Sequence, residues 1–258
     1  MTDDWGEPLV ARFVDEHYGS LRGRVRTYVI DSHLSSHLGP PPARIVDVGG
    51  GAGHQSLPLA RRGYDVTIVD PSEAMLDRAA SMLGVEDRSV AERVHLVRAS
   101  CEEAPELLGR GGFAAVLCHG VIMYVQDPRP FVAALAALAA PAGIVSVAAK
   151  NAATLATRPA LRGDWEAALA AFGPSVRQVN GLGVDTRADT IEGLTDMFAE
   201  AGIDLVDWYG VRLFTDGWTP DRPAEDPEET VLRVELEASR RDPYRSMSRM
   251  FHFVGVRR

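Results

Sequence analysis

Cysteine is nearly absent from the 258-residue chain. The two that occur, Cys101 and Cys118, cannot build a disulfide framework or a cysteine metal cage. No apolar run reaches the roughly 18 to 20 residues of a membrane-spanning helix, and the most apolar stretch, 131–140, is too short. The first five residues are acidic and no apolar segment follows them, so no signal peptide is expected. We therefore expect a cytoplasmic protein with free cysteines, no membrane contact and no metal.

Lysine is also nearly absent, since Lys150 is the only one among the 27 basic residues. Because alanine, glycine and proline are abundant as well, this indicates a coding bias, and the number of arginines says little about function. The net charge is −9, whereas domains that grip a nucleic-acid backbone are usually basic. Acidity argues against that role for the chain as a whole but leaves room for a local basic patch.

The middle of the chain alternates between β-branched runs and helix-like stretches. The pattern predicts strands at 44–48, 65–69, 94–97, 113–118 and 143–148. It predicts helices between them, including 73–83, with Ser72 as N-cap, and 129–139. Strands that alternate with helices imply crossover connections and a parallel sheet, hence an α/β fold.

The two flanks of this core are predicted separately. Residues 1–43 form a helical cap, with one helix over 9–17 and a second that ends before Pro40, since proline cannot continue a helix. Residues 152–190 form an insertion with one or two short helices. The C-terminal part, 191–258, resumes the alternation with a helix at 190–201, a strand at 205–214, a helix at 225–240 and a strand at 251–256. No long linker occurs, so we expect a single domain over 1–258, with 44–150 as its cofactor-binding core.

A glycine-rich loop stands between the first strand and the next helix. It reads Val46-Asp47-Val48-Gly49-Gly50-Gly51-Ala52-Gly53. Glycines there let the backbone approach a ligand beside a helix N-terminus, although a tight turn without a ligand is the alternative. The dinucleotide pattern G-x-G-x-x-G/A fails, because its third position would be His54 or Ser56, and the Gly-Lys-Ser/Thr of a P-loop is missing. What remains is Asp-x-Gly-x-Gly-x-Gly.

Asp70 closes the second strand, 19 residues after Gly51. A carboxylate at that position accepts hydrogen bonds from the two hydroxyl groups of a ribose. A lone aspartate at a strand end is more often a turn residue. Its combination with the glycine loop favours a nucleoside-containing cofactor.

These motifs resemble those of the class I S-adenosylmethionine-dependent methyltransferases. The resemblance covers about 44–150 and includes the glycine loop, the segment Val69 to Leu76, the segment Phe113 to Tyr124 and the turn Ala139 to Gly143. It implies a Rossmann-like, seven-stranded, mostly parallel sheet with helices on both faces and an antiparallel last strand. It also implies S-adenosylmethionine as cofactor and methyl transfer as the reaction, in which alignment of donor and acceptor and exclusion of water are the main tasks.

The flanks support a narrower resemblance, to the bacterial tRNA 5-carboxymethoxyuridine methyltransferases, which esterify a carboxylate on a wobble uridine. It is carried by Tyr18-Gly19, Gly23, Arg26, His119, Asp127-Pro128-Arg129, Asn151-Ala152, Gly210 to Phe214, Asp216, Leu236-Glu237, Arg240, Pro243-Tyr244, Arg249 and His252. The resemblance implies a cofactor site of Arg26, Asp47, Gly49, Gly50, Gly51, Gly53, Asp70, Ser100, Cys101 and His119. Candidate substrate contacts are Tyr18, Tyr124, Asn151, Arg212, Tyr244 and Arg249.

Two of these residues have specific expected roles. Arg26 could pair with the methionine carboxylate of the cofactor, which suits the fork geometry of a guanidinium, or belong to a solvated basic helix face with Arg22 and Arg24. His119 follows the fourth strand and is a candidate cofactor contact or general base, with a purely structural histidine as the alternative. No catalytic residue is assigned beyond it.

The methyl acceptor stays open between a tRNA carboxylate and a small molecule of specialised metabolism. The insertion carries four arginines against four acids, which together with the net charge favours the small molecule. The last 19 residues carry six arginines against Asp242 alone, which indicates either an anion-facing edge or a solvated strand flank. A cofactor-binding module without an acceptor site is a third alternative, and the oligomeric state is not indicated.

Overall fold

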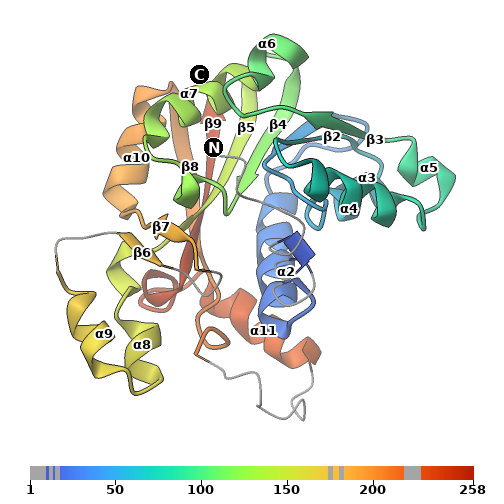
Figure 1. Ribbon diagram of the computed structural model, residues 1–258. Helices are drawn as coiled ribbons and strands as arrows, with labels where there is room; N and C mark the ends of the chain where they lie inside the picture. The colour runs from blue at the N-terminus through green and yellow to red at the C-terminus, as the bar shows by residue number, and fades with distance from the viewer. Residues whose placement is uncertain (1–9, 12–13, 15–17, 174–176, 180–182, 218–227) are drawn as a thin grey trace.

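A seven-stranded sheet organises the molecule (Figure 1). The computed structural model describes residues 10–258 except 12–13, 15–17, 174–176, 180–182 and 218–227. The strand order is β3-β2-β1-β4-β5-β9-β8, and β9 is antiparallel to both of its neighbours while β1 to β5 are parallel. The strands are β1 (Arg44–Val48), β2 (Asp65–Asp70), β3 (Val94–Arg98), β4 (Phe113–His119), β5 (Ala139–Lys150), β8 (Ile203–Val211) and β9 (Met250–Arg257). The predicted α/β, Rossmann-like fold is confirmed.

Helices cover both faces of this sheet. They are α2 (Leu21–Ser35), α3 (Ser56–Arg61), α4 (Glu73–Leu83), α5 (Arg88–Ala91), α6 (Ala104–Leu108), α7 (Pro128–Leu138), α10 (Ile191–Glu200) and α11 (Glu228–Ala238). The insertion adds α8 (Thr157–Leu161), α9 (Trp165–Ala170) and a hairpin of β6 (Arg177–Val179) and β7 (Asp185–Arg187), which lie beside one end of the sheet (Figure 1). Short 3₁₀ turns are η2 (Ile122–Tyr124), η3 (Ala152–Thr154) and η4 (Arg245–Met247).

Side chains that close helix ends explain why the predicted helices begin where they do. The hydroxyl of Ser72 accepts the backbone N–H of Met75 at the start of α4, as the sequence predicts. Thr190 does the same for Gly193 at the start of α10. Each cap satisfies a backbone donor that the first turn of a helix leaves unpaired.

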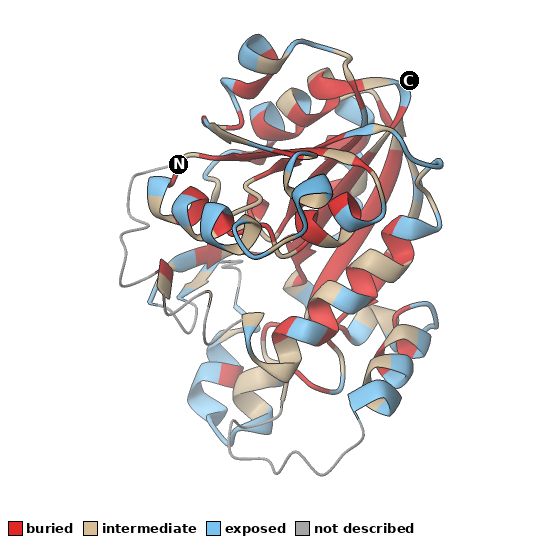
Figure 2. Ribbon diagram, turned by 90° about the vertical axis from the view of Figure 1, so that its right-hand side faces the viewer, coloured by how far each residue is buried: buried red, intermediate tan, exposed pale blue. Residues whose placement is uncertain are grey.

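The core has two main layers, one on each face of the sheet (Figure 2). Along β4, Val116 and Cys118 pack toward α7 and α10, while Ala115 and Leu117 pack toward α3 and α4. This alternation is the period of two of a strand buried on both faces. A smaller cluster places Val29 of α2 against the end of β5 and β8.

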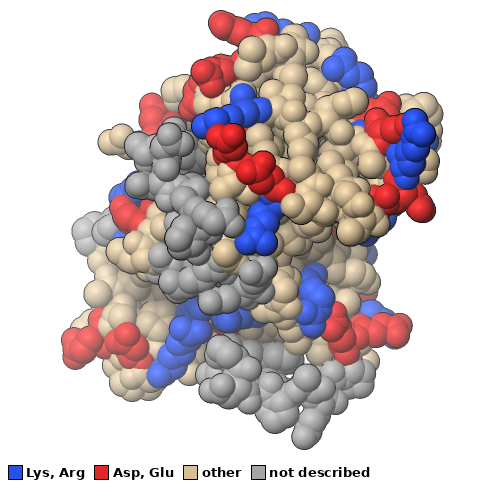
Figure 3. Space-filling view, turned by 45° about the vertical axis from the view of Figure 1, so that its right-hand side comes forward, with Lys and Arg blue, Asp and Glu red and all other residues tan. Residues whose placement is uncertain are grey.

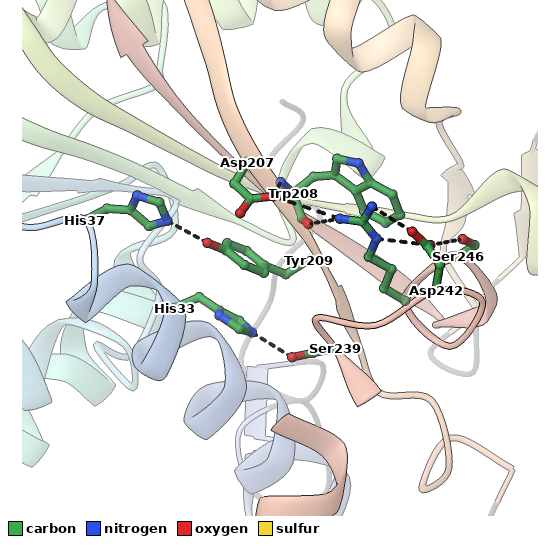
Figure 4. Close-up of polar contacts among 9 residues, drawn as sticks. His33, His37, Asp207, Trp208, Tyr209, Ser239, Asp242 and Ser246 are labelled. Atoms are coloured by element: carbon green, nitrogen blue, oxygen red, sulfur yellow. Dashed lines mark hydrogen bonds and ion pairs between the residues drawn. The ribbon is translucent and has the colours of Figure 1, made fainter. Parts of the chain in front are cut away.

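Aromatic and polar contacts hold α2 on the sheet (Figure 4). The ring of His33 stacks on Tyr209 of β8 with centroids 3.7 Å apart, and its Nε2 lies 2.7 Å from the hydroxyl of Ser239. One turn later, His37 Nε2 lies 2.8 Å from the Tyr209 hydroxyl. Burial lowers the pKa of His33 to about 3, so this contact is between neutral groups at physiological pH.

The structure corrects several predicted boundaries. The fifth strand begins at Ala139 rather than 143, because Ala139 pairs with Phe113 across a register shift. The eighth strand ends at Val211 rather than 214, since Arg212 has φ 62°, outside the extended region. The helices α5 and α6 and the hairpin β6–β7 were not predicted. The helix expected over 9–17 falls largely outside the described residues. Within the described part of the chain, no helix is long and apolar enough to cross a membrane.

Gly255 on β9 allows a sharp test of the packing between β9, β8 and α10. A Cβ added there would lie 2.5 Å from Ile203 Cγ2 and 2.9 Å from the backbone oxygen of Asp204. We expect Gly255→Ala to lower the free energy of unfolding by about 1–3 kcal/mol, the usual cost of overpacking. Gly39→Ala is the matched control, because nothing lies within 4 Å of its added methyl. Equal urea midpoints for the two variants would contradict this description of the packing.

Candidate active site

The ends of three neighbouring parallel strands define the candidate site. The glycine loop follows β1, Asp70 ends β2 and His119 ends β4, so all three lie at the carboxyl edge of the sheet. Ligands of open α/β sheets bind at this edge. The structure thus brings together residues that are far apart in the sequence but that sequence motifs had singled out.

The loop is held against β2 by hydrogen bonds that require glycine. Gly49 and Gly51 have φ of 70° and 52°, a region that residues with a Cβ rarely adopt. The N–H of Gly49 donates to Val69 O at 2.7 Å, and the N–H of Gly51 donates to the Asp70 carboxylate at 3.0 Å. A Cβ at Gly49 would lie 2.4 Å from the side chain of Val121. Glycine at 49 therefore lets the loop and the end of β4 meet.

Asp70 is anchored but keeps accepting capacity. One carboxylate oxygen accepts from Gly51 and the other from the N–H of Ser72 at 2.9 Å. Each oxygen has a further lone pair, and the residue lines the cavity described next. Burial raises the pKa of Asp70 to about 6, against the two backbone hydrogen bonds. A ligand hydroxyl bonded to this carboxylate would favour its ionised form.

Two adjoining cavities meet at the glycine loop. The first encloses about 540 Å³ and is lined by the loop, Asp70, Met75, His119, Gly120, Val121, Tyr18 and Tyr124. The second encloses about 1130 Å³ and is lined by residues that include Ser100, Cys101 and Glu102. Gly49, Val121 and Tyr124 line both. The predicted cofactor residues that line a cavity therefore divide between the two, which together suit an elongated ligand, whereas Arg26, Asp47 and Gly53 line neither.

The residues fit S-adenosylmethionine. A Cβ built on Gly51 would come within 4.0 Å of Asp70 Oδ2 and 3.5 Å of Met75 Sδ, so the missing side chain leaves open the cradle beside the carboxylate. Asp70 would hold a ribose there. Beyond it, Ser100 forms a reciprocal box with Glu103, whose carboxylate accepts the Ser100 N–H at 2.8 Å and whose own N–H donates to the Ser100 hydroxyl at 3.3 Å. Cys101 is buried in the wall.

Asp47, Gly50 and Gly53 support the loop. The Asp47 carboxylate lies beneath it, where it accepts the hydroxyl of Ser56 at 2.7 Å and does not line either cavity. Burial raises the pKa of Asp47 to about 6, although the Ser56 hydrogen bond and Arg26 oppose this. A direct cofactor contact by Asp47, which the sequence predicts, has no support in this placement. Gly53, with φ 83°, donates to Gly50 O at 3.0 Å and begins the turn into α3.

Arg26 lies behind the cavity wall. Its guanidinium donates to the backbone oxygen of His119 at 2.6 Å and to the hydroxyl of Tyr18 at 3.2 Å. A Cβ built on Gly120, which lines the cavity, would lie 3.2 Å from the guanidinium. Tyr18 is stacked on His54 with centroids 4.0 Å apart. A carboxylate contact by Arg26 stays a prediction, while its hold on the end of β4 is direct.

His119 is part of a buried chain of polar side chains. Its Nε2 lies 2.8 Å from the Ser146 hydroxyl, which lies 2.7 Å from Nε2 of His252. Burial, with Arg26 nearby, lowers the pKa of His119 to about 3. His119 is therefore a neutral residue in the cavity wall over the physiological range. Neither Ser146 nor the link to His252 had a signal in the sequence.

The predicted substrate contacts do not form one group. Tyr18 and Tyr124 line the first cavity, whereas Arg212 and Arg249 line a separate cleft beside the insertion. Tyr244 is exposed, next to Phe214.

Asn151 has a structural role and is corrected as a substrate contact. It is fully buried, its amide nitrogen donates to Ser246 O and Ser248 O, and its amide oxygen accepts from Ala153. These bonds tie the insertion to the approach to β9 and occupy the polar atoms of the side chain.

The C-terminal arginines likewise separate. Arg245 stacks over Trp208 and pairs with Asp242, and Arg241 pairs with Glu237. Arg258 lies near Asp204, at the start of β8 and so at the opposite edge of the sheet. A single anion-facing edge made of all six is therefore wrong, and Arg249 alone joins the cleft beside the insertion.

Comparisons with known proteins agree with this geometry. A family model described as a methyltransferase domain matches residues 46–147. The chain is 26% identical to the tRNA 5-carboxymethoxyuridine methyltransferase of Escherichia coli K12, over 98% of this chain and 95% of that protein. It is 35% identical to the ubiquinone biosynthesis O-methyltransferase of Caulobacter sp. K31, over 42% of this chain and 41% of that protein. The structure of Burkholderia thailandensis 1,6-didemethyltoxoflavin-N1-methyltransferase, with bound S-adenosylhomocysteine, is similar in fold, with a TM-score of 0.58, 18% identity and coverage of 96% and 87%. Residues 46–147 therefore match a methyltransferase domain, and the chain as a whole shares its fold with a methyltransferase of known structure.

Removal of the Asp70 carboxylate tests the cofactor site. We expect Asp70→Ala to weaken binding of S-adenosylhomocysteine by about 1.5–3 kcal/mol, because hydrogen bonds to a charged acceptor are lost and the loop loses the bond at Gly51. Isothermal titration calorimetry measures the difference, with Asp87→Ala, at an exposed position beyond the end of α4, as control. NAD binding as tight as that of S-adenosylhomocysteine would contradict the assignment.

The raised pKa of Asp47 predicts a pH-dependent stability. Its folded pKa of about 6 lies above its ordinary value near 3.8. Its contribution to stability is therefore fully present below pH 3.8 and is lost as the pH rises through 6. Asp47→Asn should raise the free energy of unfolding of the cofactor-free protein at pH 7.5 by at most about 3 kcal/mol, and its melting temperature should rise with it. The gain should shrink toward pH 4. Asp87→Asn should show no such trend, and a gain that is equal at every pH would refute the cause.

Proposed function

We propose that this S-adenosylmethionine-dependent methyltransferase transfers the methyl group to a carboxylate oxygen, and that the acceptor is the 5-carboxymethoxy group of a tRNA wobble uridine. The support is the similarity to the Escherichia coli enzyme over 98% of the chain, far beyond the 46–147 domain that methyltransferases of many kinds share. That similarity includes the insertion, which follows the carboxyl end of β5, and the strands β8 and β9, which meet the same edge of the sheet at Val211 and Met250.

The cofactor supplies an activated methyl group, whose bond to sulfur breaks as a bond to the acceptor oxygen forms. The chain's own residues have the tasks of binding and alignment. The loop and Asp70 would fix the ribose, and the wall formed by His119, Gly120 and Val121 would set the direction of approach. Tyr18 and Tyr124 also line the cavity and would help to exclude water.

The observation that carries the carboxylate proposal is the state of His119. A carboxylate is ionised at neutral pH and releases no proton on methylation, whereas a hydroxyl acceptor needs a base with a pKa near the working pH. His119 has its pKa lowered to about 3 and its Nε2 engaged by Ser146, which makes it a weak base. The other titratable side chains among the described lining residues of the first cavity are Asp70, which is assigned to the ribose of the cofactor, and the two tyrosines.

A small-molecule O-methyltransferase is the second candidate. The observations in its favour are the net charge of −9 and the local similarity to the ubiquinone biosynthesis O-methyltransferase. Figure 3 shows basic and acidic side chains mixed over one face of the molecule, without a broad field of one sign. A polyanionic acceptor would therefore need a confined basic site.

The pH profile of the transfer step separates the two acceptor chemistries. With a carboxylate acceptor and saturating cofactor, the single-turnover rate should be flat from about pH 6 to 8. His119→Gln cannot accept a proton in this range but keeps a hydrogen-bonding amide. It should lower the saturated rate by less than the roughly 10²–10⁴-fold cost of losing a general base.

His95→Gln, an exposed residue of β3, is the matched control and should leave rate and profile unchanged. A limb with an apparent pKa near 6.5 that disappears in His119→Gln, together with a collapse of the rate, would show that His119 is a base and favour a hydroxyl acceptor. Mass spectrometry of nucleosides from cells with and without the gene identifies the acceptor directly.

A further inference from the structure

Basic side chains converge on one carboxylate at the edge of the sheet where β5 and β8 end and β9 begins. Asp216 forms an ion pair with Arg212, and its other oxygen lies 3.9 Å from Nε of Arg249. Electrostatic interactions link these groups to Arg158 and Arg162 of the insertion and to Arg22 of α2. Lys150, the last residue of β5, interacts with Arg249 in the same way. This cation cluster comprises Arg22, Lys150, Arg158, Arg162, Arg212 and Arg249.

The cluster carries more positive charge than its described surroundings neutralise. Among the described residues, Asp216 is the carboxylate that forms ion pairs with these cations. Arg212 is 7% exposed, yet its Nε has no hydrogen-bond partner among the described residues. The Nε of Arg158 also has no hydrogen-bond partner among them. Buried guanidinium groups are costly unless an anion or acceptor meets their donors.

The electrostatics of the groups reflect this excess. Burial, together with neighbouring arginines, lowers the pKa of Arg158 to about 10. Burial and Arg249 lower the pKa of Lys150 to about 8. Burial would raise the pKa of Asp216, but Arg212 and Arg249 overcome it and hold that pKa below its ordinary value. A second anion at this place would therefore relieve the repulsion among the cations that Asp216 does not neutralise.

The residues that carry the unpaired donors line an open cleft. Arg158, Arg212 and Arg249, together with Asp216, line a cleft of about 260 Å³ between α8 and the chain that follows β8. Arg158 and Arg249 also line a groove of about 1410 Å³ along α8, α9 and β6, where Arg162 and Arg177 join them and Asp164 is the one acid among the described lining residues. A small cleft of buried donors that opens into a basic groove suits a polyanion better than a lone small acid.

The position of the cleft identifies the group that it would bind. Neighbouring strands of a sheet are spaced by roughly 4.8 Å, and β8 is three places from β4 in this sheet. The backbone of Arg212 therefore lies about 14 Å from the end of β4, where His119 borders the methyl-transfer cavity. The reacting carboxylate belongs at that cavity, so the cleft would meet a different anionic group of the same acceptor. We propose that Arg158, Arg212 and Arg249 form an oxyanion site that takes a backbone phosphate of a polynucleotide acceptor, an inference that rests on the proposed function.

The first test uses inorganic phosphate as the probe of the site itself. At equal ionic strength, millimolar phosphate in place of chloride should raise the melting temperature of the parent protein, since a ligand that binds the folded state stabilises it. Arg158→Gln combined with Arg249→Gln should abolish this shift. Arg88→Gln, an exposed arginine of α5, should keep it. A phosphate shift of the same size in the double variant would overturn the site.

Melting temperatures in phosphate-free buffer distinguish a purely structural role of Arg158 and Arg249 from a role in anion binding. If the two arginines served only to hold the fold, the double variant would melt at a lower temperature in phosphate-free buffer, which would count against the proposal. The proposal predicts little change there, because relief of repulsion among the arginines offsets the loss of the contact between Arg249 and Asp216. Binding of S-adenosylhomocysteine, unchanged within about twofold, shows that the variant is folded.

The second test uses an anticodon stem-loop RNA. Its affinity for the double variant should fall at least about tenfold, as expected when charge-assisted hydrogen bonds are removed. The slope of log affinity against log salt should flatten by about 0.7–0.9 for each phosphate that the variant no longer neutralises. An unchanged slope would overturn the assignment to a backbone phosphate. If the parent protein binds no RNA while the phosphate shift still disappears in the double variant, the proposed acceptor is wrong and the oxyanion site stands.

Discussion

The hydrogen bond from the backbone of Gly51 to the carboxylate of Asp70 is the contact on which the site depends. It closes because Gly49 and Gly51 adopt positive φ and because Val121 packs where a side chain at Gly49 would otherwise stand. The ends of β1, β2 and β4 are thereby fixed relative to one another before any ligand arrives. The same closeness buries Asp70 and raises its pKa, so the site is assembled around a carboxylate that a bound hydroxyl would favour in its ionised form.

Features encoded over a few residues could be predicted from the sequence. The strands, the Ser72 cap, the glycine loop and Asp70 each have a local pattern, and the structure places them as expected. The start of β5 was missed, because Ala139 joins the sheet through its partner Phe113 in another strand rather than through its own neighbours. The end of β8 was missed for a similar reason: nothing near Arg212 in the sequence announces its positive φ.

Contacts between distant segments could not be predicted, and they decide what the second half of the site looks like. Asn151 reads as a polar residue at a strand end, and only the fold shows that Ser246 and Ser248 occupy its amide. The insertion has equal numbers of arginines and acids, but folding separates them. Two of its acids pair locally, Asp185 with Arg177 and Asp189 with Arg187, while Arg158 interacts with Asp216 outside the insertion. A count of charges cannot show such a separation.

The insertion leaves and re-enters the sheet at almost one point. Asp189 donates its N–H to Lys150 O at 2.8 Å and accepts the N–H of Ala152 at 2.9 Å, so the two ends of the segment are joined by a short parallel bridge. Because the ends already meet, the entropy cost of a longer or shorter segment between them grows only slowly with its length. The methyl-donor half of the molecule could therefore stay constant while this segment is exchanged, which gives the architecture a replaceable recognition module for acceptors of different size and charge.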